Sequence, residues 1–144
     1  MKLNAFSDYT LRTLIYLALV EGTNVTAQEV ASRFDLSFHH IAKVAQWLAR
    51  NGYVKASRGR GGGMTLIVPP EEISIGTVMR ATERGTAIIE CMKPGASSCK
   101  ITPACLLAPA INEAQEAFFA TLDQKTLADI ISNKTHLKRV LNVA

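Results

Sequence analysis

Three cysteines lie close together in the second half of the chain and are its residues best suited to chemistry. Cys91, Cys99 and Cys105 are separated by seven and by five residues, and the 144-residue chain contains no other cysteine. Disulfide frameworks use pairs of cysteines spread through a fold. An odd number clustered within fifteen residues therefore favours metal binding or redox chemistry inside a cell.

The spacing of these cysteines bears on what they could bind. Structural zinc sites use C-x2-C pairs with a further Cys or His nearby, and this segment contains neither such a pair nor a histidine. Wider spacing suits a larger object such as an iron–sulfur cluster, whose usual protein ligands are thiolates. Three thiolates would leave one iron for another ligand. Two alternatives stay open: three thiols with no ligand, and a thiol–disulfide switch.

The chain also contains a cluster of basic residues that could bind a nucleic acid. Residues 36–70 contain five Lys or Arg and no Asp or Glu, so this window carries +5, whereas the whole chain carries +4. Arg58 and Arg60 alternate with glycines, which let the backbone approach a partner closely while an arginine enters a minor groove of DNA. No G-K-[ST] follows, so this is not a phosphate-binding loop. We expect a DNA contact rather than an ordinary solvated turn.

The spacing of apolar residues predicts the elements that position this basic window. It predicts a first helix over residues 7–20, for which Ser7 is a suitable cap, and shorter helices over 26–34 and 37–50. Two strands are expected over 53–57 and 64–68, on either side of the arginine–glycine turn. This is the element order of a winged helix-turn-helix.

In such an arrangement the helix over 37–50 is the one that fits the major groove of DNA. Its apolar residues Ile41, Val44 and Leu48 recur on one face, so polar side chains are left on the opposite face. The side chains expected to contact DNA, from this helix and from the hairpin tip, are Ser37, His39, His40, Lys43, Arg58 and Arg60.

The rest of the chain is predicted to be helical apart from the cysteine loop. A helix is expected from Ser74 to about Glu83, and a longer apolar one opening at Thr102, which Pro109 would kink unless the regular helix begins there. A last short helix is expected over 126–131. The long apolar helix favours a surface that faces a partner. The expected fold is mainly α with a small β-hairpin.

Composition narrows the class of protein. Hydrophobic residues make up 48% and charged residues 19%, which excludes a disordered chain. No apolar run approaches the roughly 18 residues of a membrane span, so a soluble, cytoplasmic protein that does not bind membranes is expected. No pairing of a nucleophile with a base stands out, so we do not expect an enzyme.

Motifs spread over nearly the whole length match one known family. They are residues 6–9 (FSDY), residues 58–63 (RGRGGG), the Cys99-x5-Cys105 spacing and residues 126–129 (TLAD). Through them the chain resembles the IscR, NsrR and RirA family of winged-helix iron–sulfur regulators. The resemblance implies a homodimer in which the helix after the third cysteine packs against its mate. It also implies an iron–sulfur cluster bound by Cys91, Cys99 and Cys105.

Within this family the chain is most similar to the NsrR branch of nitric-oxide-sensing repressors, through residues 7–12 (SDYTLR) and 99–105 (CKITPAC). The histidine of IscR-type members, three residues after the third cysteine, is replaced here by Ala108. The NsrR branch implies a 4Fe–4S cluster in preference to a 2Fe–2S one, completed by an aspartate from the first helix of the other subunit. Asp8 occupies the matching position. The seven-residue first gap, however, resembles RirA, an iron-responsive repressor.

The resemblance implies three functional parts. These are a winged helix-turn-helix DNA-binding domain over 1–83, a cluster-binding loop over 84–106, and a dimerisation helix with a short C-terminal helix over 107–144. The expected function is a dimeric repressor that leaves its double-stranded DNA operator when nitric oxide reacts with the cluster. The alternatives are the same fold sensing iron or cluster supply, and a cluster-free cysteine redox switch.

Overall fold

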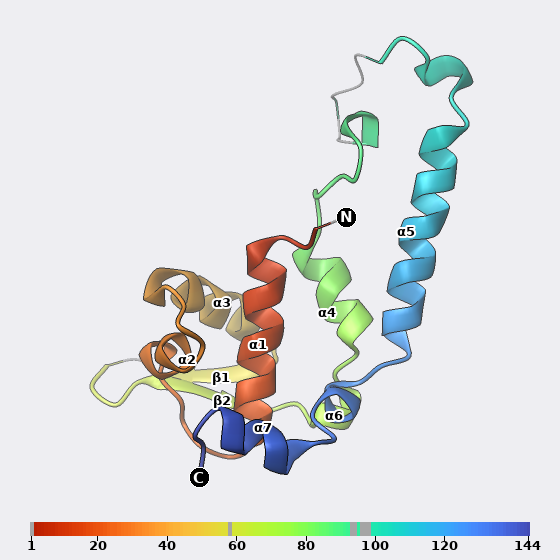
Figure 1. The fold of residues 1–144 in the computed structure, drawn as a ribbon. Coiled ribbons are helices and arrows are strands. Elements are labelled where there is room, and N and C mark those ends of the chain that lie inside the picture. The colour runs from red at the N-terminus through yellow and green to blue at the C-terminus, as the bar shows by residue number, and fades with distance from the viewer. Residues whose placement is uncertain (1, 58, 93–94, 96–98) are drawn as a thin grey trace.

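The structure is a computed structural model that describes residues 2–57, 59–92, 95 and 99–144. It is mainly helical, with one two-stranded sheet, and the expected fold class is confirmed (Figure 1). Helix α1 lies between the short helices α2 and α3 on one side and α4 on the other, and α5 extends away from this body.

The helix-turn-helix consists of α2 (Ala27–Phe34) and α3 (Phe38–Arg50), which pack against α1 (Ala5–Leu19). Thr26 caps α2 by accepting from the backbone N–H of Glu29, which satisfies a donor that the helix itself leaves unpaired. Asp35 adopts a left-handed φ of 53° at the end of α2. This residue turns the chain between the two helices.

The predicted start of α1 was wrong. The helix begins at Ala5 and is capped by Asn4, whose side-chain oxygen accepts from the backbone N–H of Ser7 at 2.7 Å. Ser7 is instead buried inside the first turn, where its hydroxyl donates to the carboxylate of Glu83. A distant partner therefore recruits the side chain that local capping rules assigned to the helix end.

The wing is an antiparallel hairpin of β1 (Val54–Ser57) and β2 (Gly63–Leu66), close to the predicted strands. A further bridge joins Met64 to Val25, in the connection between α1 and α2. A Cβ at Gly63 would stand 2.6 Å from the carbonyl oxygen of Val25. Only glycine therefore lets this connection approach the hairpin so closely.

One continuous core runs beneath α1 and joins most of the elements. Its fully buried large side chains are Leu14, Tyr16, Leu17, Val25, Val30, Ile41, Val44, Leu48, Met64, Ile73, Leu127 and Ile131. In the part of the chain that the structure describes, no helix is both long enough and apolar enough to cross a bilayer.

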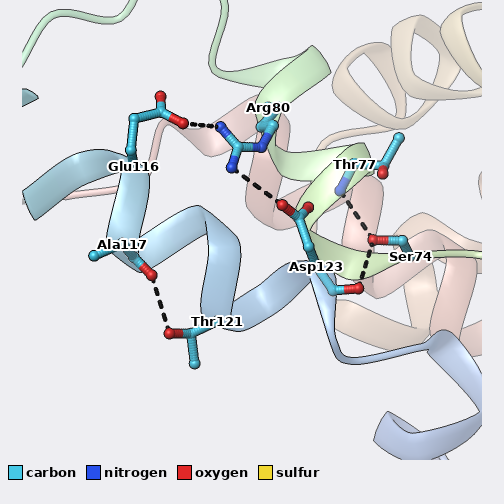
Figure 2. Close-up of polar contacts among 7 residues, drawn as sticks. All are labelled: Ser74, Thr77, Arg80, Glu116, Ala117, Thr121 and Asp123. Carbon is cyan, nitrogen blue, oxygen red and sulfur yellow. Dashed lines mark hydrogen bonds and ion pairs between the residues drawn. The ribbon is translucent and has the colours of Figure 1, made fainter. Parts of the chain in front are cut away.

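Helix α4 (Ile75–Thr82) follows the short 3-10 helix η1 (Pro70–Glu72) and packs along α5 (Leu107–Asp123). Arg80 joins the two helices, since its guanidinium donates to Glu116 at 2.6 Å and to Asp123 at 3.1 Å (Figure 2). These hydrogen bonds raise the pKa of Arg80. The same guanidinium stands 4.9 Å from the centroid of the Phe119 ring, which is the geometry of a cation–π contact.

The long helix begins later than predicted. Two further 3-10 helices, η2 (Glu90–Met92) and η3 (Thr102–Ala104), precede it, and Cys105 then adopts an extended conformation. Helix α5 starts at Leu107, which places Pro109 in its first turn. Residues there have no intrahelical partner for their N–H groups, so the proline removes no hydrogen bond and needs no kink.

The chain ends in two short helices, of which only the first was predicted. Helix α6 (Leu127–Ile130) begins with a capping box between Thr126 and Asp129. These hydrogen bonds from Thr126 lower the pKa of Asp129. Helix α7 (Lys134–Val140) has no side-chain cap and mostly polar residues, so it lacks the local signals of a helix. It returns to α1, where Leu137 and Leu141 pack against the core.

Candidate DNA-binding surface and cysteine segment

Helix α3 exposes one polar face. Ile41, Val44 and Leu48 are fully buried beneath it, while Ser37, His39 and Lys43 are exposed as predicted. Ser37 is the N-terminal cap residue, and its side chain makes no capping hydrogen bond within the described structure. Its hydroxyl and the first N–H groups of α3 are therefore available to an anion such as a phosphate.

Two residues of this face were missed by the sequence-based prediction. Gln46 and Arg50 are exposed and follow Lys43 at helical spacing, so they continue the line that starts at His39. That spacing was the available signal. Amide and guanidinium groups are among the side chains that bind base edges or phosphates.

A groove of about 630 Å³ lies between α3 and the hairpin. Its lining includes the aromatic Phe38, the polar residues Gln46, Arg50 and Ser57, and Gly59 of the hairpin turn. Phe38, at the N-terminus of α3, is 45% exposed. An exposed ring in this place is suited to apolar contact with a thymine methyl group.

Of the two arginines expected at the hairpin tip, the structure describes one. Arg60 is exposed in the turn between β1 and β2, whereas Arg58 lies outside the described residues. The tip is held by Asn24, whose amide donates to the carbonyl of Gly61 at 2.8 Å. No acidic residue occurs between Asp35 and Glu71, so the surface formed by α3 and the wing has a cationic field suited to a polyanion.

His40 differs from the other predicted DNA contacts. It is exposed, but its ring lies 5.6 Å from the ring of Tyr9 in α1. Trp47 lies two turns further along α3. Its ring meets the ring of Phe6 edge to face, with 6.1 Å between the centroids, and stacks on the ring of Tyr53, with 5.9 Å between the centroids. Burial raises the pKa of Tyr53, so its phenol adds no charge to this surface. The first turn of α1 thus packs directly on the proposed recognition helix.

Asp8 projects from that same turn and is held by its own helix. Its Oδ1 accepts a hydrogen bond from Arg12 Nε at 3.0 Å, and its Oδ2 forms an ion pair with Arg12 Nη2 at 2.8 Å. Both side chains are 42% exposed, and Asp8 lines an open hollow of about 770 Å³ at the start of α1. The carboxylate is therefore accessible to a ligand, for which it would compete with Arg12.

The three cysteines lie on the segment that joins α4 to α5, far from the helix-turn-helix (Figure 1). All three are free thiols: Cys91 is half-buried in η2, Cys99 is exposed, and Cys105 is half-buried after η3. In chemistry, three free thiols fit an iron–sulfur cluster. In geometry, the described residues of the chain do not gather three potential metal ligands into one group.

The tip of the cysteine segment is apolar and exposed. Ile101, Leu106 and Leu107 are 62%, 84% and 59% exposed, and Phe119 is the one buried residue of α5, all of whose residues are described. Large apolar side chains gathered on one exposed element are typical of surfaces that meet another protein.

Comparison with known proteins agrees with this architecture. The sequence profile of the Rrf2 family, described as "Iron-dependent Transcriptional regulator", matches residues 3–133. The HTH-type transcriptional regulator NsrR of Bacillus subtilis is 40% identical over 144 residues, covering 99% of each chain. The protein of the same name from Geobacillus kaustophilus is 39% identical, covering 98% of this chain and 97% of that one.

Solved structures show the same fold. The oxidized form of Staphylococcus aureus CymR superposes with a TM-score of 0.68 at 27% identity, covering 90% of this chain and 95% of that one. The IscR of T. potens superposes with a TM-score of 0.71 at 23% identity, covering 92% of this chain and 88% of that one. The resemblance read from the sequence motifs is thereby confirmed: this chain belongs to the Rrf2 family of transcriptional regulators.

Proposed function

We propose that the protein is a homodimeric repressor that binds double-stranded DNA through α3 and the wing. Nitric oxide is its proposed signal, and an iron–sulfur cluster, 4Fe–4S in preference to 2Fe–2S, its sensor. Relatives named NsrR at 39–40% identity over nearly the full length support this reading. The exposed line from His39 to Arg50 and the exposed Arg60 supply the charge that DNA binding needs.

Cys91, Cys99 and Cys105 would hold the cluster, and Asp8 of the partner subunit would complete it. A carboxylate binds iron less strongly than a thiolate does, so that position is the one most open to a small molecule. The three parts of the chain then have separate tasks: DNA binding in 1–83, cluster binding in 84–106, and dimerisation in 107–144, with the apolar side chains near the start of α5 facing the second copy.

One observation carries the proposal. Asp8 sits between Phe6 and Tyr9, whose rings contact Trp47 and His40 of α3. A bond between Asp8 and a ligand would therefore restrain the first turn of α1, which packs against the recognition helix. Loss of that bond would change the equilibrium between two positions of α3, which is how a chemical signal becomes a change in DNA affinity.

Protein purified without oxygen tests the cofactor. We expect iron and acid-labile sulfide in the wild type and their loss after Cys99→Ser or Cys105→Ser. Asp8→Ala should alter the visible spectrum and weaken the response of DNA binding to nitric oxide. If Asp8→Ala leaves both unchanged, the role of Asp8 is rejected.

The DNA-binding surface is tested by Lys43→Ala and Arg60→Ala, with Lys125→Ala as a matched control on the connection between α5 and α6. We expect each surface variant to cost about 1–3 kcal/mol of specific binding if the side chain reads a groove. The affinity of the wild type should also fall steeply with salt, since phosphate contacts release counterions. Equal affinity of the surface variants and the control would reject the assignment.

Two alternative signals are each supported by an observation. The description of the family as iron-dependent favours a sensor of iron or cluster supply. The exposure of Cys99, on a segment that carries two other free thiols, favours a disulfide switch. Absence of iron and sulfide from anaerobic protein would select the switch, and a cluster whose DNA affinity ignores nitric oxide would select the iron sensor.

A further inference from the structure

Glu83 is the single charged side chain that is buried among the residues the structure describes, with 8% of its surface exposed. It ends α4, immediately before the cysteine segment. A carboxylate is removed from water only where hydrogen bonds replace its hydration. Its partners therefore show what this position is for.

Among the described residues, those partners are the N-cap residue of α1 and a residue of its first turn. The hydroxyl of Ser7 and the backbone N–H of Asn4, the latter at 3.0 Å, donate to the same Glu83 oxygen, Oε1. The side-chain amide of Asn4 also donates to the carbonyl of Thr82 at 3.1 Å and to the hydroxyl of Thr86 at 3.4 Å. Four hydrogen bonds thus fasten this turn to the end of α4 and the beginning of the cysteine segment.

The other side of the same turn contacts α3. Phe6 and Tyr9 pack their rings against Trp47 and His40, and Asp8 lies between them. Residues 4–9 therefore touch the cysteine segment through polar groups on one side and the recognition helix through aromatic rings on the other. Figure 1 shows the N-terminal end of α1 beside the chain that leaves α4.

The two hydrogen bonds to Glu83 Oε1 should break together rather than one at a time. If the first turn of α1 shifts, Oε1 loses both donors together, because both come from one turn. The carboxylate is then buried without partners, a state that is costly enough to force a larger rearrangement. Packed aromatic rings transmit such a displacement because they cannot be compressed.

We propose that Glu83 is a positioning residue that couples the cysteine segment to the recognition helix by clamping residues 4–9 to the end of α4. The coupling of DNA affinity to the cluster rests on the proposed function, whereas the clamp itself does not. The clamp acts within one chain, alongside any bond that Asp8 makes to a cluster. It gives the cysteine segment a route to α3 that needs neither Asp8 nor the partner subunit.

Amide hydrogen exchange on metal-free protein tests the clamp without reference to a cluster. Glu83→Ala should raise exchange about fivefold or more in residues 6–9 and in the first half of α3, while exchange in α6 stays as in the wild type. Glu83→Gln keeps an acceptor oxygen and should restore slow exchange. Glu72→Gln, an exposed residue of η1, is the matched control.

Unchanged exchange in α3 after Glu83→Ala would overturn the proposal, and so would a rise spread evenly over the whole molecule, which is the mark of a merely structural role. If Glu83→Ala does not fold, Ser7→Ala removes one donor and should give the same local pattern. No change in α3 there would overturn the proposal equally.

DNA binding supplies the second readout. In Ser7→Ala and Glu83→Ala, iron and sulfide content should match the wild type, while the ratio of DNA affinities between cluster-loaded and cluster-free protein should fall by about tenfold, within the usual range of such couplings. An unchanged ratio contradicts the coupling. A wild type with no cluster contradicts the proposed function instead, and the exchange experiment then decides the clamp alone.

Discussion

The helix-turn-helix and the arm formed by the cysteine segment and α5 contain similar apolar residues but bury them very differently. In the first region Ile41, Val44 and Leu48 are fully buried. In the arm, Leu106 and Leu107 are 84% and 59% exposed, and Phe119 is the one buried residue of α5. A single chain therefore closes the core of the helix-turn-helix. The apolar residues of the arm stay exposed in one chain, and we propose that a second copy covers them.

The largest effect predicted from this comparison is a difference between two leucines. Leu48→Ala leaves a cavity in the closed core and should lower the free energy of unfolding by about 2–5 kcal/mol. Leu107→Ala removes an exposed side chain and should change it by no more than about 0.5 kcal/mol in dilute, monomeric protein. Chemical denaturation measures both values. Equal costs would show that the arm is as closed as the core.

The same two variants should rank in the opposite order when dimerisation is measured instead of stability. Sedimentation should show weaker dimers for Leu107→Ala, whereas the folded fraction of Leu48→Ala should still dimerise. Dimers of Leu107→Ala as tight as those of the wild type would remove the exposed start of α5 from the interface.

A smaller effect is expected where the arm is fastened to the body. A Cβ added at Gly76 in α4 would stand 2.1 Å from a carboxylate oxygen and 2.5 Å from the backbone nitrogen of Asp123. Gly76→Ala should therefore destabilise the protein by about 1–3 kcal/mol, although alanine normally favours a helix. Thr77→Ala, at an exposed neighbouring position, is the control for denaturation. A stabilised Gly76→Ala would show that α4 and α5 do not approach this closely.

The smallest effect is expected at Arg80. Its ion pairs with Glu116 and Asp123 (Figure 2) join side chains that are 35–57% exposed. Ion pairs that reach solvent in this way contribute little and are screened by salt. Arg80→Ala should lower the Tm less than Gly76→Ala does, and the difference from the wild type should shrink at about 1 M salt. If the loss of Tm is the same at low and high salt, the stabilising contact of Arg80 is the one with the Phe119 ring rather than the ion pairs.

The helix-turn-helix was predictable because its signals are local. Thr26 with Glu29 marks one helix start, the 3.6-residue spacing of Ile41, Val44 and Leu48 marks the buried face, and β-branched residues flank the glycine-rich turn. The predicted DNA-facing residues Ser37, His39, Lys43 and Arg60 are correspondingly exposed in the structure. Their contact with DNA remains a prediction.

The parts that sequence did not predict depend on distant contacts. The sequence around Ser7 is that of a helix cap, but in the fold the Ser7 hydroxyl donates a hydrogen bond to Glu83, 76 residues away. Helix α7 forms although it lacks a side-chain cap, because α1 supplies the surface on which Leu137 and Leu141 pack. His40 is exposed like the other residues expected to contact DNA, but its ring contact with Tyr9 could not be read from the sequence. In each case the deciding partner belongs to another element.

We propose that one event, the reaction of the cluster with nitric oxide, controls DNA binding. The most direct test of this proposal is an anaerobic titration of cluster-loaded protein, bound to a duplex that the protein has selected from random DNA, with visible absorbance and DNA binding followed in the same sample. We expect cluster absorbance and DNA affinity to fall together within a few equivalents of nitric oxide per cluster. DNA affinity that stays constant while the cluster absorbance is lost would contradict it.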